Sequence, residues 1–180
     1  AVGYVAGRDT NDGVNNVFLG GLAGFDGDNA DNNVFVGYAA GQNNAASNNT
    51  AVGKDSLRTN TSGTQNTALG NASMELNTTG NFNVAIGCGA MICNTTGAET
   101  VAIGRKAGNV NTGSKNIHIG ASAGVNMTSG ADNVFLGSCA GQGTSGSATG
   151  NCNIAIGYAA LGAATSGCRN IAIGELAMGT

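Results

Sequence analysis

Hydrophobic and polar residues recur along this chain in a phrase that is written eleven times. The phrase reads asparagine, apolar residue, any residue, apolar residue, glycine, two further residues and a small residue, as in FNVAIGCGA and RNIAIGELA. Successive copies are 16 or 17 residues apart, with one interval of 20 residues. A period this short and regular predicts a solenoid in which each copy forms one rung. The glycines that anchor the copies are Gly3, Gly20, Gly37, Gly53, Gly70, Gly87, Gly104, Gly120, Gly137, Gly157 and Gly174.

Counting from the anchoring glycine as position zero, positions −3 and −1 hold Val, Ile, Leu or Thr in almost every copy. Alternating β-branched residues predict a short strand before each glycine, for example over residues 84–86. The invariant glycine indicates a positive φ or a close approach of another backbone segment. The small residue at +3 indicates a crowded corner, and the glycine common at −7 indicates a turn. We therefore expect an all-β fold, a parallel β-solenoid of about eleven rungs of 16–17 residues.

Asparagine stands at position −4 in nine copies. A catalytic asparagine would not recur on every rung, whereas a stacked amide ladder would, because each side chain bonds the copies above and below it. Asparagine also tolerates the left-handed backbone of a corner. The predicted ladder consists of Asn16, Asn33, Asn49, Asn66, Asn83, Asn116, Asn133, Asn153 and Asn170.

Position −2 points away from −3 and −1 in a strand, and it is Ala or Phe in every copy except one, which has His118. If −3 and −1 fill the solenoid, position −2 must meet something outside it, so we expect it to form a subunit interface. Copies with a large residue at −2 have glycine at +4, and copies with a large residue at +4 have alanine at −2, as in Ala85 and Met91. The two positions therefore share one limited volume. The predicted interface consists of Phe18, Phe35, Ala51, Ala68, Ala85, Ala102, His118, Phe135, Ala155 and Ala172.

Composition excludes several classes of protein. Only 9% of the residues are charged, the net charge is −3, and the seven basic residues form no stripe, which disfavours nucleic-acid binding. No apolar run is long enough to insert into a membrane. The 41% of apolar residues argues against disorder. Of the five cysteines, Cys152 and Cys168 lie on adjacent rungs where a disulfide is geometrically possible, but small buried or half-buried thiols are the interpretation we favour.

No catalytic constellation is visible. His118 is the only histidine and has no Ser or Cys partner. A polysaccharide-degrading solenoid would need paired carboxylates on neighbouring rungs of one face, and none are found. Asp26, Asp28 and Asp31 form the best metal candidate, but the calcium-loop pattern is incomplete and a solvated loop is the better interpretation. We therefore expect no enzyme activity and no cofactor.

The copies FNVAIGCGA, CNIAIGYAA and RNIAIGELA resemble the head repeats of trimeric autotransporter adhesins, and QNTALGNASMELNTTG is similar to the repeat arrays of phage tail and side fibres. The resemblance covers essentially all 180 residues. It implies a left-handed β-roll assembled as a parallel homotrimer, with the strand turned towards the threefold axis.

The period and the NTTG and TSG linkers favour a phage fibre over an adhesin. We therefore expect a structural and adhesive segment of a virion tail fibre, acting as shaft or host-attachment region. The alternative is a bacterial trimeric adhesin head or a self-assembling extracellular filament. The expected partners are further copies of the chain and a cell-surface receptor or glycan, contacted through variable positions such as Tyr4, Tyr38, Tyr158 and Arg105. Because neither terminal copy carries a polar cap, we expect residues 1–180 to be one repeat region of a longer fibrous protein.

Overall fold

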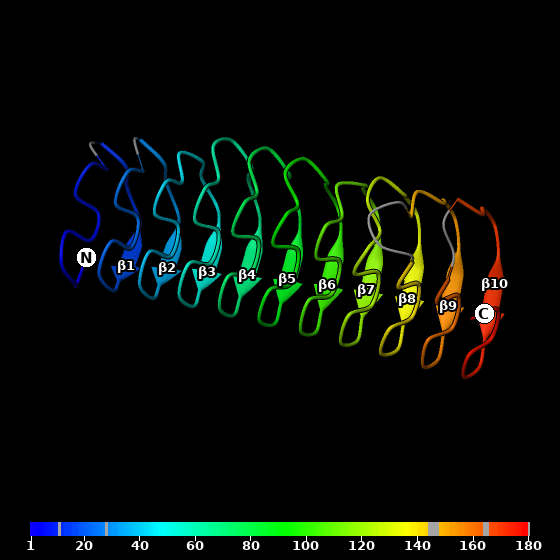
Figure 1. Ribbon diagram of the computed structural model, residues 1–180. Coiled ribbons are helices and arrows are strands. Elements are labelled where there is room, and N and C mark those ends of the chain that lie inside the picture. Colours follow the sequence, from blue (N-terminus) through cyan, green and yellow to red (C-terminus); the bar gives the residue numbers. More distant parts are fainter. Residues whose placement is uncertain (11, 28, 144–147, 164–165, 180) are drawn as a thin grey trace.

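The structure is a computed structural model that describes all residues except 11, 28, 144–147, 164–165 and 180. The chain winds into a column of stacked coils, and each coil contributes one three-residue strand to a single parallel sheet (Figure 1). The ten strands follow one another in sequence order, so the solenoid predicted from the repeat is confirmed. The strands are β1 (Val17–Leu19), β2 (Val34–Val36), β3 (Thr50–Val52), β4 (Thr67–Leu69), β5 (Val84–Ile86), β6 (Val101–Ile103), β7 (Ile117–Ile119), β8 (Val134–Leu136), β9 (Ile154–Ile156) and β10 (Ile171–Ile173).

The truncated first copy adds no strand of its own. It joins the sheet through an isolated parallel bridge between Val2 and Leu19. The described part of the chain contains no helix, and therefore none long and apolar enough to cross a bilayer.

Equivalent positions of neighbouring copies pair directly in the sheet. Ala85, for example, lies opposite Ala102. The amide of Val84 donates to the carbonyl of Thr100 at 2.9 Å, and the amide of Gly87 donates to the carbonyl of Leu69 at 2.8 Å. Each strand is thus bonded to the rung before it and the rung after it, which satisfies its buried backbone groups.

The anchoring glycines combine both features that their invariance predicted. Gly87 has a φ of 129°, and a Cβ atom built on it would lie 2.7 Å from the carbonyl carbon and oxygen of Gly104. The backbone of one rung therefore passes directly over the glycine of the next. No other residue type fits this approach without displacing the backbone.

The corners of each coil are left-handed even where the residue is not glycine. Among the residues that the structure describes, 25 other than glycine have positive φ, and they occupy positions −5, +2 and +4, as in Glu99, Lys106 and Met91. The left-handed residue before the strand is thus at −5 rather than at the asparagine of position −4. Isolated L-residues seldom adopt this conformation, so the repeated stacking must hold it in place.

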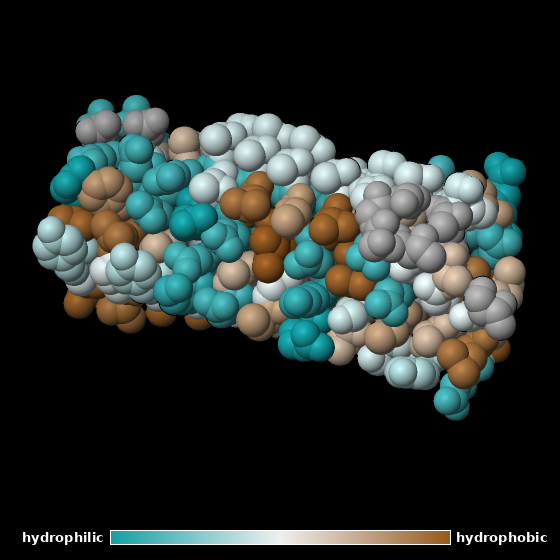
Figure 2. Space-filling model, in the orientation of Figure 1, coloured by the Kyte–Doolittle hydropathy of each residue, from teal (hydrophilic) through white to brown (hydrophobic). Residues whose placement is uncertain are grey.

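The interior of the coil is narrow and is filled from positions −2, +3 and +4. Ala85, Ala90 and Met91 of one rung are all fully buried. The described part of the rod, drawn as a space-filling surface in Figure 2, is long relative to its width. On the side drawn there, hydrophobic and hydrophilic residues are mixed, with hydrophobic residues gathered towards the middle and both ends.

Candidate interaction surface

The side chains at positions −3 and −1 point out of the coil. Each strand has a buried central residue flanked by two residues that are exposed or half-buried. In β1, for example, Val17 is 52% exposed and Leu19 is 47% exposed, whereas Phe18 is 7% exposed. The alternation predicted from the sequence is therefore present, but its direction is reversed.

This reversal overturns the predicted subunit interface. The ten residues proposed for it lie inside their own coil, where no second chain can reach them. The physical reason is the width of the coil, which admits one central side chain per strand but not the two β-branched side chains beside it. The residues that move from the predicted interface to the interior of the coil, all buried in a single chain, are Phe18, Phe35, Ala51, Ala68, Ala85, Ala102, His118, Phe135, Ala155 and Ala172.

The outer face of the sheet is a chemically uniform surface. It contains two residues from each of ten strands, of which eighteen are Val, Ile or Leu and two are Thr50 and Thr67. Eight of these residues are between 36% and 67% exposed and the other twelve are half-buried, so the exposed area is of the order of the roughly 800 Å² per partner that a standard interface buries. Monomers seldom expose a contiguous apolar patch larger than about 300–600 Å². We call this set of twenty residues the outer face: Val17, Leu19, Val34, Val36, Thr50, Val52, Thr67, Leu69, Val84, Ile86, Val101, Ile103, Ile117, Ile119, Val134, Leu136, Ile154, Ile156, Ile171 and Ile173.

The asparagines at position −4 stack along one corner of the column. Their amides bond backbone groups of the next rung rather than chiefly one another. Asn66 accepts from the amide of Asn83 at 3.1 Å through Oδ1 and donates through Nδ2 to the carbonyl of Gly80 at 2.9 Å. Direct amide-to-amide bonds within this column occur near its C-terminal end, as between Asn153 and Asn133 at 3.1 Å.

A second asparagine column, at position +7, escaped the sequence analysis. Nδ2 of each residue donates to Oδ1 of the preceding one, from Asn60 to Asn44 at 2.6 Å, Asn77 to Asn60 at 2.8 Å and Asn94 to Asn77 at 3.2 Å. All four side chains are fully buried. The signal was present in the sequence, because these residues recur at intervals of 16 or 17 residues, but the variable linkers around them obscured it.

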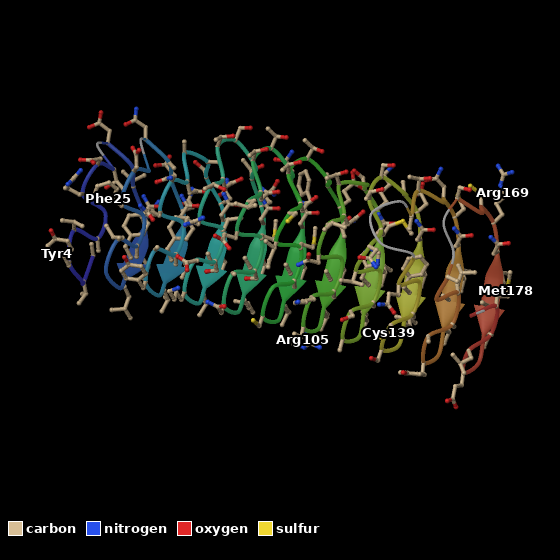
Figure 3. The ribbon with its side chains drawn as sticks, viewed as in Figure 1. Tyr4, Phe25, Arg105, Cys139, Arg169 and Met178 are labelled. Carbon is tan, nitrogen blue, oxygen red and sulfur yellow. The ribbon has the colours of Figure 1, made fainter. Side chains whose placement is uncertain are left out.

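The variable positions on the rim of the coil are exposed. The three tyrosines, all at position +1, are 81% exposed at Tyr4, 53% at Tyr38 and 56% at Tyr158. Figure 3 shows Tyr4 projecting from the N-terminal end and Arg105 at the turn that follows β6. These side chains are available to a partner, but no pocket forms around them in the described part of the chain.

The other candidate sites find no support in the geometry. Asp28 of the metal candidate lies outside the described residues. Asp26 is exposed, and Asp31 uses Oδ1 to accept from the amide of Val14 at 2.7 Å. Among the described residues, no group of three or more His, Cys, Asp or Glu side chains could hold a metal ion.

The five cysteines are free thiols, and all of them are exposed or half-buried. Cys152 and Cys168, for which a disulfide was geometrically possible, are therefore not bonded to each other, although both thiols are exposed rather than half-buried. Comparison of the chain with protein-family models, with curated proteins and with solved structures finds no match.

Proposed function

We propose that this chain is a structural segment of a fibre that assembles as a parallel homotrimer through the outer face. The observation that carries the proposal is the outer face itself, which is uncharged along the whole sheet and apolar except at Thr50 and Thr67. Water contact with so much aliphatic surface is unfavourable by about 25 cal/mol per Å², so burial against further copies is strongly favoured. A closed assembly also accounts for why the surface bears no lysine or glutamate.

A threefold arrangement suits the shape of this face. The face is only two side chains wide on each strand but extends along ten strands. Three such narrow strips meet around one axis and shield one another. Two strips packed face to face would leave the flanks of both in contact with water. The likeness to adhesin heads and phage fibres supports the same assembly, with a left-handed coil and the strand turned towards the axis.

Within this architecture, the function we propose is that of a phage tail-fibre shaft or host-attachment region. The rim residues, including Tyr4, Tyr38 and Tyr158, would contact a cell-surface receptor or glycan, since exposed tyrosines are favoured in binding sites. The copies that read AIG, such as FNVAIGCGA, favour a bacterial adhesin head or an extracellular filament as the second candidate. Both place the chain on a virion or outside the cell.

Assembly is tested by light scattering coupled to size exclusion. The wild-type chain should elute as a trimer, and Ile103→Lys combined with Ile86→Lys should give a folded monomer. Both lysines would be solvated in the free chain but buried in the trimer. Glu99→Lys, on an exposed turn of the same rung as Ile103, is the matched control and should remain trimeric. A wild-type chain that is monomeric at micromolar concentration contradicts the proposed assembly.

Biological context is tested by immunogold electron microscopy with an antibody against this chain. Label along fibres that project from virus particles supports the tail fibre, whereas label on cell surfaces supports the second candidate. Label confined to the cell interior contradicts both.

A further inference from the structure

His118 is a buried ionisable residue that the proposed assembly does not use. It is the central residue of β7, and its side chain is fully buried inside the coil. Neither Nδ1 nor Nε2 has a hydrogen-bond partner among the residues that the structure describes. Buried polar atoms are almost always paired, so an imidazole with both nitrogens unpaired requires an explanation.

The described neighbours of His118 carry no group that would accept a proton or stabilise a charge. The ring of Phe135, from β8, lies 5.4 Å away, and Ala102 lies opposite His118 in β6. The corner glycines Gly108 and Gly124 close the remaining sides, since a Cβ atom on either would contact the imidazole. None of these neighbours ionises. The absence of a charged neighbour is why burial alone lowers the pKa of His118, to about 4.

The same rung interrupts the apolar filling of the coil, although β7 stays in register with β6 and β8. One cluster of buried apolar side chains ends at Ala107 and another begins at Ala123, with His118 between them. The position −4 ladder is also weakest here. Thr100 replaces asparagine, and its hydroxyl accepts from the amide of Asn116 at 3.3 Å. By comparison, the amide of Asn133 bonds Oδ1 of Asn116 at 2.9 Å.

We propose that the rung of His118 is an acid-sensitive seam, at which protonation of the imidazole opens the coil between β6 and β8. The imidazolium carries two N–H donors, and the closed coil provides no acceptor for either. The charged form is therefore stable only when the rung opens and water reaches it. Mild acid favours this open form because an exposed histidine takes up a proton near pH 6.5.

Opening of β7 would also disturb the outer face, because Ile117 and Ile119 flank His118 on the same strand. This consequence rests on the proposed function, whereas the seam itself is a property of one chain. In the assembly, mild acid should then weaken the contact between chains around β7 first.

Hydrogen exchange followed by mass spectrometry, corrected for the intrinsic pH dependence of exchange, tests the seam. Between pH 7.5 and pH 5.0, protection of the β6–β8 amides should fall by about 30-fold, the ratio set by an open-state pKa of 6.5 and a closed-state value near 4. The amides of β3–β5, which have no ionisable core residue, should change far less. The ring protons of His118, followed by NMR, should show no titration near pH 6.5 in the closed form.

His118→Phe is the decisive variant, because Phe35 and Phe135 already fill this position beside a corner glycine. It should fold and should lose the acid effect at β6–β8. If it folds poorly, His118→Ala with Gly124→Met reproduces the Ala85 and Met91 arrangement and serves the same purpose. Phe135→His should extend the effect towards β9.

If the His118 variants lose as much protection at β6–β8 in acid as the wild type does, the seam is overturned and the effect belongs to the carboxylates. Unchanged protection in the wild-type chain would overturn it as well. Light scattering at both pH values separates the two proposals. A monomer with an acid-sensitive β7 contradicts only the assembly, and a trimer with an unresponsive β7 contradicts only the seam.

Discussion

The ring of Phe35 occupies the space into which Gly41 would extend a side chain. A Cβ atom built on Gly41 would overlap the ring, and both residues are buried inside the same coil. The reciprocal arrangement is found where Ala85 stands opposite Met91, both fully buried. In most rungs one large side chain therefore fills the core, and it is supplied either by the strand or by the corner. The rung of β6, with Ala102 and Gly108, is small at both positions.

Replacing one of these arrangements by the other should leave stability nearly unchanged only when positions −2 and +4 are substituted together. Ala85→Phe with Met91 retained should overpack the rung and destabilise the chain by about 1–3 kcal/mol. Adding Met91→Gly should recover most of that loss, because the pair then matches Phe35 and Gly41. Urea unfolding of the two single variants and the double variant gives the coupling energy. Additive single effects would show that the two side chains do not share one volume.

Removal of one ladder asparagine should destabilise the column strongly. Asn66→Ala leaves the amide of Asn83 without its partner in a buried position, whereas the carbonyl of Gly80 still accepts from Nδ2 of Asn77 at 3.1 Å. The expected loss is about 1–3 kcal/mol in urea unfolding, from one buried group left unpaired. Ser62→Ala, at an exposed position of the same rung, is the control and should change stability by less than about 0.5 kcal/mol. A similar loss of stability in both variants would show that the ladder does not stabilise the column.

Substitution of an anchoring glycine should destabilise the chain more where a neighbouring backbone segment passes close to it. Gly87 and Gly174 both have positive φ, of 129° and 121°, but only Gly87 has a neighbouring backbone within 4 Å of its Cβ position. Gly87→Ala should therefore cost about 1–3 kcal/mol more than Gly174→Ala, since both strain φ but only one overpacks. Thermal unfolding of the two variants measures the difference. Equal losses of stability would show that positive φ alone explains why every copy of the repeat has glycine at this position.

The stability of a single chain should decrease in mild acid. Burial lowers the pKa of His118 to about 4, below the value of about 6.5 in the unfolded chain, so the unfolded state binds the proton more tightly. Above pH 6.5 the neutral, buried His118 makes its full contribution to the free energy of unfolding. This contribution, about 3 kcal/mol in total, is lost as the pH falls to about 4. Urea unfolding of the wild type and His118→Phe at pH 7.5, 6.0 and 4.5 should show curves that diverge as the pH falls. Parallel curves would contradict an effect of His118.

Much of the architecture could be predicted from the sequence because every rung repeats the same local requirements. The three-residue strands, the crowded +3 corner and the close approach at Gly87 all follow from residue types that recur at one period. The sequence also predicted the shared volume of positions −2 and +4. It did not predict that this volume belongs to one chain.

The sequence by itself determined the period, the parallel register and the alternation within each strand, because stacking places equivalent residues on top of one another. Only the tertiary structure decided which side of the strand is inside. Alternation states that Ala85 and Ile86 point in opposite directions, but both faces are apolar, so hydrophobicity does not distinguish them. The direction in which the coil closes is set by the left-handed corners at positions −5, +2 and +4, and the narrow coil that results holds the alanine and leaves the isoleucine on the outer face.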